Sequence, residues 1–180
     1  MLTVARALVD PSLARWLAEE DTRPDLPAAP TPEARLAAYE AIVHRRTTSL
    51  SSPTRGLQLP WPRAFGTPPW GALAELENGA AASGTRYRIR TLRLTGAREL
   101  RRDVARLSRL VTDATPAVLY VGSRSMPRHV ALVVPGEDGL AVYDPGYGRV
   151  VPLRADELAE HRLDVGGWAV PWFVVEPMGR

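Results

Sequence analysis

Apolar residues recur every three or four positions in much of the N-terminal part of the chain, which is the spacing of amphipathic helices. This spacing predicts a short apolar helix over residues 2–9, a second helix that restarts at Pro11, and a longer helix from Pro32 to about Arg46. Thr31 suits the N-cap of the long helix, because its hydroxyl can accept a bond from a free N–H of the first turn. The residues expected on the inner side of the long helix are Leu36, Tyr39, Ile42 and Val43.

Polar and apolar residues alternate in the second half of the chain, as they do in half-buried strands. A strand is predicted over residues 86–94, followed by an amphipathic helix over 97–112 and later by a short helix over 155–161. Further strands are predicted at Ala117–Val121, His129–Val134, Leu140–Tyr143, Gly148–Leu153 and Trp172–Val175. Because the helices come first and most strands follow one another through short turns, the expected fold class is α+β with a mainly antiparallel sheet.

The segment between these halves follows neither pattern and is rich in Thr, Ser, Pro and Gly. The stretch Trp61–Trp70 combines two tryptophans, a phenylalanine and three prolines, which we expect to fix irregular backbone onto the core, with a cleft wall as the alternative. Thr67 is a candidate cap for a short helix entered through Pro68 and ended at Asn78-Gly79. We expect one domain over residues 1–180, with a helical part (1–46), an irregular part (47–84) and a sheet part (85–180).

The composition is that of a globular protein, with 45% hydrophobic and 24% charged residues. No apolar run approaches the ~20 residues of a membrane helix, and the opening residues lack the basic lead-in and cleavage site of a signal peptide, so a cytoplasmic location is expected. The chain has no cysteine, which excludes a disulfide framework and a thiolate metal site. All 23 basic residues are arginine, which is typical of a GC-rich bacterial coding sequence such as an actinobacterial one.

The arginines concentrate in two runs, over residues 86–93 and 98–109, although the net charge is only +3. A solvated strand face and helix face explain these runs, and a basic surface for an acidic partner is the alternative. No nucleic-acid partner is expected, because no aromatic platform or known motif accompanies the arginines. The three histidines lack metal-ligand spacing, so neither a metal nor a cofactor is expected.

One histidine and one aspartate stand where chemistry is plausible. His129 lies near the start of a predicted strand, and Asp144 lies at the end of the next one. Antiparallel strands joined by a tight turn bring the start of one beside the end of the other. The carboxylate would then orient the imidazole and stabilise its protonated form, as a base–orienter pair requires. The alternative is that Asp144, which precedes a proline, is a turn residue and that His129 bonds locally.

The residues Pro127–Val133 and Val142–Gly148 resemble the histidine strand and the Asp-Pro-x-x-Gly strand of the bacteriocin-processing (double-glycine leader) cysteine peptidases, a papain-like group. The resemblance covers roughly residues 115–153. It implies a papain-like fold in which His129 is the general base and Asp144 its orienter. The family also uses a cysteine at the start of its first long helix and a glutamine shortly before it. Neither is matched by position, and Gln58, which lies in the irregular segment, is not given that role.

The missing cysteine leaves two explanations. Residues 2–8 read like the continuation of the family's cysteine-bearing helix, so either the start was assigned too late or the chain is a pseudoenzyme. In either case the 180 residues are not expected to hydrolyse peptides by a thiolate mechanism, and the pair is expected to face the N-terminus of the first helix. A non-catalytic module that binds a peptide or protein is the alternative function. Ser123 and Ser125 are not favoured as nucleophiles, because Gly-x-Ser-x-Gly is absent.

Overall fold

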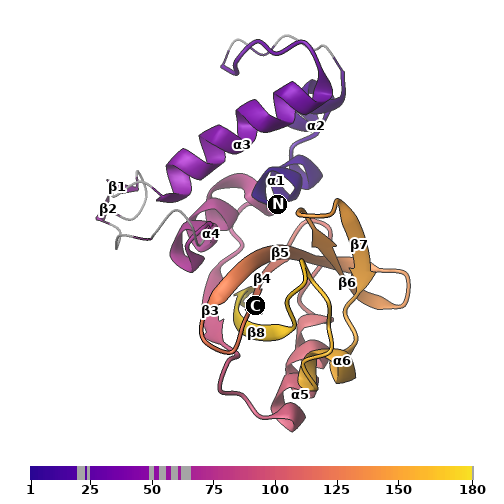
Figure 1. Ribbon diagram of the computed structural model, residues 1–180. Coiled ribbons are helices and arrows are strands. Elements are labelled where there is room, and N and C mark those ends of the chain that lie inside the picture. The colour runs from indigo at the N-terminus through magenta and orange to yellow at the C-terminus, as the bar shows by residue number, and fades with distance from the viewer. Residues whose placement is uncertain are drawn as a thin grey trace.

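A six-stranded sheet lies between two layers of helices (Figure 1). The computed structural model describes residues 1–19, 23, 25–48, 51–52, 56–57, 61 and 66–179. The predicted α+β class is confirmed. Gln58 and residues 62–65 of the stretch Trp61–Trp70 lie outside the described residues, so the expectation for the whole stretch stays a prediction.

Every pair of neighbouring strands in the sheet is antiparallel, and the spatial order is β3-β8-β4-β5-β6-β7. All six strands fall where alternation predicted them, with ends that differ by at most three residues. The strands are β3 (Tyr87–Thr91), β4 (Ala117–Gly122), β5 (Pro127–Gly136), β6 (Gly139–Asp144), β7 (Arg149–Pro152) and β8 (Val170–Pro177). The short strands β1 (Ser51–Ser52) and β2 (Gly56–Leu57) pair with each other in the segment that was expected to be irregular.

The N-terminal helices form the layer above the sheet in Figure 1. They are α1 (Leu2–Val9), α2 (Pro11–Ala18), α3 (Pro32–Thr48), α4 (Pro69–Glu75) and the π-helical turn η2 (Leu76–Ala80). Asp10 separates α1 from α2, because its carboxylate accepts the N–H of Ser12 and Leu13. Thr31 caps α3 as predicted, with its hydroxyl 3.2 Å from Ala34 N. Thr67 is not the cap of α4, which has Pro68 in that position.

The long helix α3 differs from its prediction on one point. Tyr39 and Val43 are buried as expected, but Leu36 is only partly buried and the side chain of Arg35 is buried instead. The Arg35 guanidinium donates to the carbonyls of Leu17 and Ala29, both at 3.3 Å. The guanidinium can be buried because it donates hydrogen bonds to these two carbonyls. The helical spacing of apolar residues did not predict that Arg35 would be buried.

The two faces of the sheet belong to two separate hydrophobic clusters. Val118, Tyr120 and Leu132 pack with α1–α4, whereas Leu119, Ala131, Val133 and Val142 pack with α5 (Ala97–Leu107) and α6 (Ala155–Ala159). Successive side chains of a strand point to opposite faces. The register therefore assigns each functional side chain on β5 and β6 to one of these two layers.

The arginines of β3 and α5 were expected to be solvated, but Arg88, Arg90 and Arg106 belong to an ion-pair network. Glu176 on β8 is fully buried, and its carboxylate accepts from Arg88 at 2.8 Å and from Arg106 at 2.6 and 2.7 Å. Arg90 forms a two-pronged pair with Asp103 at 2.6 and 2.9 Å. The network links β3, β8 and α5, so these arginines stabilise the fold and their charges are already paired within the protein.

Candidate functional site

His129 and Asp144 are in contact, as the sequence predicted. The ring atom Nε2 of His129 lies 2.8 Å from Oδ1 of Asp144. The histidine side chain is 19% exposed, whereas the aspartate side chain is wholly buried. A partly accessible imidazole is therefore held from behind by a carboxylate that solvent does not reach.

The strand register explains the contact. Leu132 of β5 is paired with Tyr143 of β6, so Asp144 stands opposite Ala131 at the next step. His129 is two residues before Ala131 and shares its face of the sheet. Diagonal neighbours on one face of an antiparallel pair lie within reach of long side chains. The contact thus follows from the pairing of β5 with β6.

The Asp144 carboxylate is held on both oxygens by backbone. Gly146 N donates to Oδ1 at 2.9 Å, and Gly166 N donates to Oδ2 at 2.8 Å. Burial alone would raise the pKa of Asp144, but the hydrogen bonds from Gly166, His129 and Gly146 outweigh burial, so its pKa is lowered from the ordinary value. Asp144 is therefore a carboxylate across the physiological pH range.

Two glycines form walls around the histidine ring. A Cβ at Gly166 would lie 2.7 Å from Cδ2 of His129, and a Cβ at Gly146 would lie 3.2 Å from Cε1. Gly166 also has a φ of +62°, a conformation that side chains disfavour. Only glycine lets the loop after α6 approach the ring this closely while its N–H reaches Asp144.

The second ring nitrogen of His129, Nδ1, is the one that can accept a proton. Nδ1 forms no hydrogen bond with any residue that the structure describes. With Nε2 engaged by Asp144, a neutral ring carries its proton on Nε2 and its lone pair on Nδ1. The arrangement can accept a proton at Nδ1 and stabilise the resulting imidazolium.

The pair does not face α1 as expected. His129 and Asp144 share the sheet face of Ala131 and Val142, which is covered by α5 and α6, whereas α1 packs against the opposite face. The expectation that the pair faces the start of the first helix is therefore wrong. It rested on the family resemblance, because the sequence pattern alone does not say which helices cover which face.

The other candidate nucleophiles are engaged in a turn. The hydroxyl of Ser123 accepts the N–H of Ser125 and of Met126, both at 3.2 Å, and lies 3.0 Å from the Ser125 hydroxyl. These bonds shape the β4–β5 hairpin, and neither serine bonds to His129. Over the described part of the chain, no group of three or more His, Asp or Glu side chains is placed to hold a metal ion.

Comparisons with protein-family models, with curated proteins and with solved structures found no match. Within the described residues, no helix is both long enough and apolar enough to span a bilayer.

Proposed function

We propose that this chain is a cysteine-peptidase-like domain in which His129 is a general base and Asp144 its orienter. The observation that carries the proposal is the 2.8 Å contact between Nε2 and a buried carboxylate that two backbone N–H groups hold in place. The resemblance of residues 115–153 to the bacteriocin-processing peptidases supports the same roles. Because the chain has no cysteine, the 180 residues are not a thiol peptidase on their own.

The chemistry of the half-site is proton transfer to Nδ1. A nucleophile near Nδ1 loses its proton to the ring as it attacks an acyl carbon, and Asp144 stabilises the positive charge that the ring then carries. A positioned base of this kind contributes about 10²–10⁴-fold to the rate of such a step. Water or the hydroxyl or thiol of another molecule can be the attacking group, since no cysteine of this chain is available.

The proposal is tested with an activated ester, because water can attack such an ester without a nucleophilic side chain of the protein. Hydrolysis of 4-nitrophenyl acetate is followed by release of 4-nitrophenolate for the wild type and for His129→Ala, Asp144→Asn and the double variant. His161→Ala is the matched control, because His161 is exposed and has no hydrogen-bonding partner for its ring among the described residues. His129→Ala is expected to remove most of the protein-dependent rate, and His161→Ala to change it by less than about twofold.

The double variant isolates the coupling between base and orienter. Asp144→Asn is expected to slow hydrolysis in the wild type and to have no effect once His129 is absent. If His129→Ala and His161→Ala lower the rate of hydrolysis equally, His129 acts no differently from an exposed histidine and the proposal is overturned. The non-catalytic peptide- or protein-binding module would then be the better description of the domain.

A further inference from the structure

Three arginines near the β4–β5 hairpin have no acidic partner. Arg93, Arg124 and Arg128 form no ion pair with any acidic side chain in the described part of the chain. The arginines of the Glu176 network are, by contrast, fully paired. An unpaired guanidinium keeps its free donors for a ligand, and carboxylates fit its fork geometry.

Two of these arginines lie over tryptophan rings. The Arg93 guanidinium lies 5.5 Å from the centre of the Trp172 ring, and Arg128 lies 6.0 Å from the centre of the Trp168 ring. Arg93 also donates to the Arg124 carbonyl at 2.8 Å. Ordering a long side chain in advance lowers the entropy cost of binding. We call these five residues the Arg–Trp surface.

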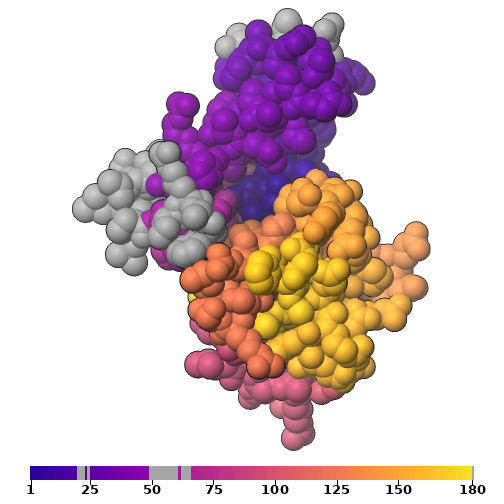
Figure 2. Space-filling view, in the orientation of Figure 1, coloured from indigo at the N-terminus to yellow at the C-terminus, as the bar shows by residue number. Residues whose placement is uncertain are grey.

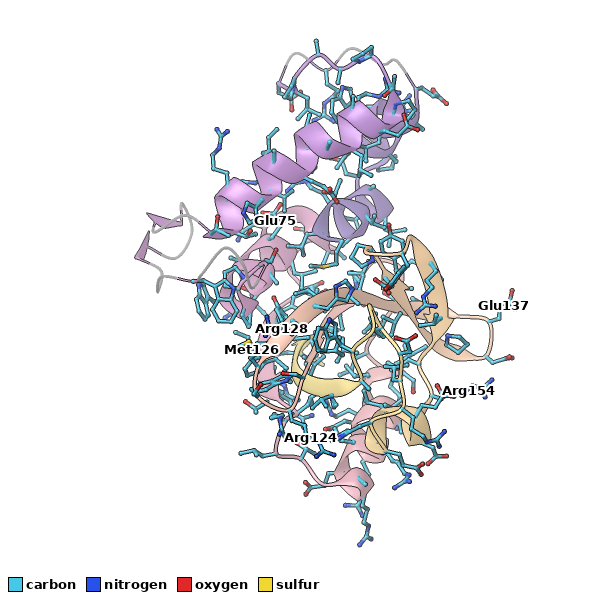
Figure 3. The ribbon with its side chains drawn as sticks, viewed as in Figure 1. Glu75, Arg124, Met126, Arg128, Glu137 and Arg154 are labelled. Atoms are coloured by element: carbon cyan, nitrogen blue, oxygen red, sulfur yellow. The ribbon has the colours of Figure 1, made fainter. Side chains whose placement is uncertain are left out.

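The Arg–Trp surface adjoins the candidate site. Arg128 lies over the Trp168 ring, and Trp168 follows two residues after Gly166, which forms one wall of the histidine ring. Trp172 reaches the same hairpin, because its Nε1 donates to the Ser123 carbonyl at 2.8 Å. Figure 2 shows the orange hairpin segment and the yellow C-terminal segment side by side on the front of the molecule. Figure 3 labels Arg124 and Arg128 in this part of the molecule.

We infer that the Arg–Trp surface binds an acidic peptide segment and delivers it to His129. Charge complementarity carries the inference, since three arginines without an acidic partner lie in or beside the hairpin that leads into His129, and the carboxylate partner of His129 is buried. Binding of the acidic segment stands by itself. Its role as the substrate of the His129 site rests on the proposed function.

Single-stranded nucleic acid is the other polyanion to consider. Proteins bind it by stacking bases on exposed aromatic faces. In the Arg–Trp surface, however, Arg93 already covers Trp172 and Arg128 already covers Trp168. The rings orient the arginines rather than offer an open stacking platform, which favours carboxylates as the ligand.

The inference is tested by fluorescence anisotropy with a fluorescein-labelled oligoglutamate at low salt. The test variant is Arg124→Glu/Arg128→Glu, because both side chains are exposed and neither makes an ion pair. The matched control is Arg15→Glu/Arg45→Glu, which makes the same charge change at exposed arginines of α2 and α3 that also form no ion pair with a described residue. The test variant is expected to lose at least about tenfold in affinity, and the control less than about twofold.

Three outcomes would overturn the inference. Equal losses in both double variants would mean that the peptide follows the overall charge rather than this surface. Absence of saturable binding by the wild type would mean that no such site exists. Tighter binding of an oligothymidylate of the same length would identify nucleic acid as the ligand.

The two proposals fail separately. If His129→Ala leaves ester hydrolysis unchanged while Arg124→Glu/Arg128→Glu still weakens oligoglutamate binding, the acidic-peptide surface stands and the base does not. If His129→Ala slows ester hydrolysis but Arg124→Glu/Arg128→Glu leaves oligoglutamate binding unchanged, His129 is a base and the Arg–Trp surface does not bind its substrate. Circular dichroism of each variant confirms that it is folded.

Discussion

Replacing Asp144 by asparagine removes one charge from the site and almost no volume. The carboxylate accepts three hydrogen bonds, from His129 Nε2, Gly146 N and Gly166 N. Asparagine has one acceptor oxygen, so whichever way its amide is turned, an NH₂ group faces the N–H of Gly146 or of Gly166. One buried donor then has no acceptor, which costs about 1–3 kcal/mol of unfolding free energy.

Urea unfolding followed by circular dichroism measures this loss. For a domain of this length each kcal/mol corresponds to about 2–4 °C of melting temperature. Asp138→Asn is the matched control, because Asp138 is exposed in the β5–β6 turn and has no partner among the described residues. Unchanged stability of Asp144→Asn at neutral pH would refute the account of the carboxylate as the centre of the site.

The pH dependence of the same comparison has a definite sign. The pKa of Asp144 is lowered in the folded protein, so its charged form stabilises the fold. That contribution is fully present above the pKa of the unfolded chain, about 3.9, and is lost as the pH falls through the lower folded value. The stability gap between wild type and Asp144→Asn is therefore expected to be widest near neutral pH and to narrow below about pH 4.

Two further substitutions test the surroundings of the site and the core. Gly166→Ala places a Cβ 2.7 Å from His129 Cδ2 at a φ of +62°, so a loss of about 1–3 kcal/mol in urea unfolding and a shifted His129 ring signal in NMR are expected. Gly84→Ala is the control, because Gly84 also has a positive φ but a Cβ there would meet open space. If Gly166→Ala loses no more stability than Gly84→Ala and its His129 signal does not shift, the packing argument is contradicted. Glu176→Ala removes the counter-charge of Arg88 and leaves Arg106 with Asp103 alone, so a loss of about 1–3 kcal/mol is expected by the same measurement. A loss no greater than that of Glu137→Ala, at an exposed glutamate, would contradict the network.

Local pattern predicted most of this fold because most of its elements are formed by neighbours in sequence. The contact between His129 and Asp144 was predictable for that reason, since a tight turn joins their strands. The role of Gly166 was not, because it reaches Asp144 from 22 residues away through a loop without periodicity. Its only signal in sequence is the Gly166-Gly167 pair, which marks a turn without indicating what the turn approaches.

The layers around the sheet were equally hidden from the sequence. Alternation shows that His129 shares a face with Ala131, but it does not show whether α1 or α5 covers that face. The partners of Glu176 come from one strand and one helix that only the folded chain brings together. Periodicity therefore predicts which residues share a face, while the choice of facing helix depends on how the whole chain is connected.

The two edge strands of the sheet limit how a peptide can bind to this protein. The outer strand β3 has arginines at alternate positions, and the outer strand β7 is only four residues long and ends in Pro152. Charged side chains and proline on outer strands oppose the addition of another strand. An extended peptide is therefore not expected to join this sheet as a seventh strand through backbone hydrogen bonds, and recognition has to rely on side chains such as those of the β4–β5 hairpin.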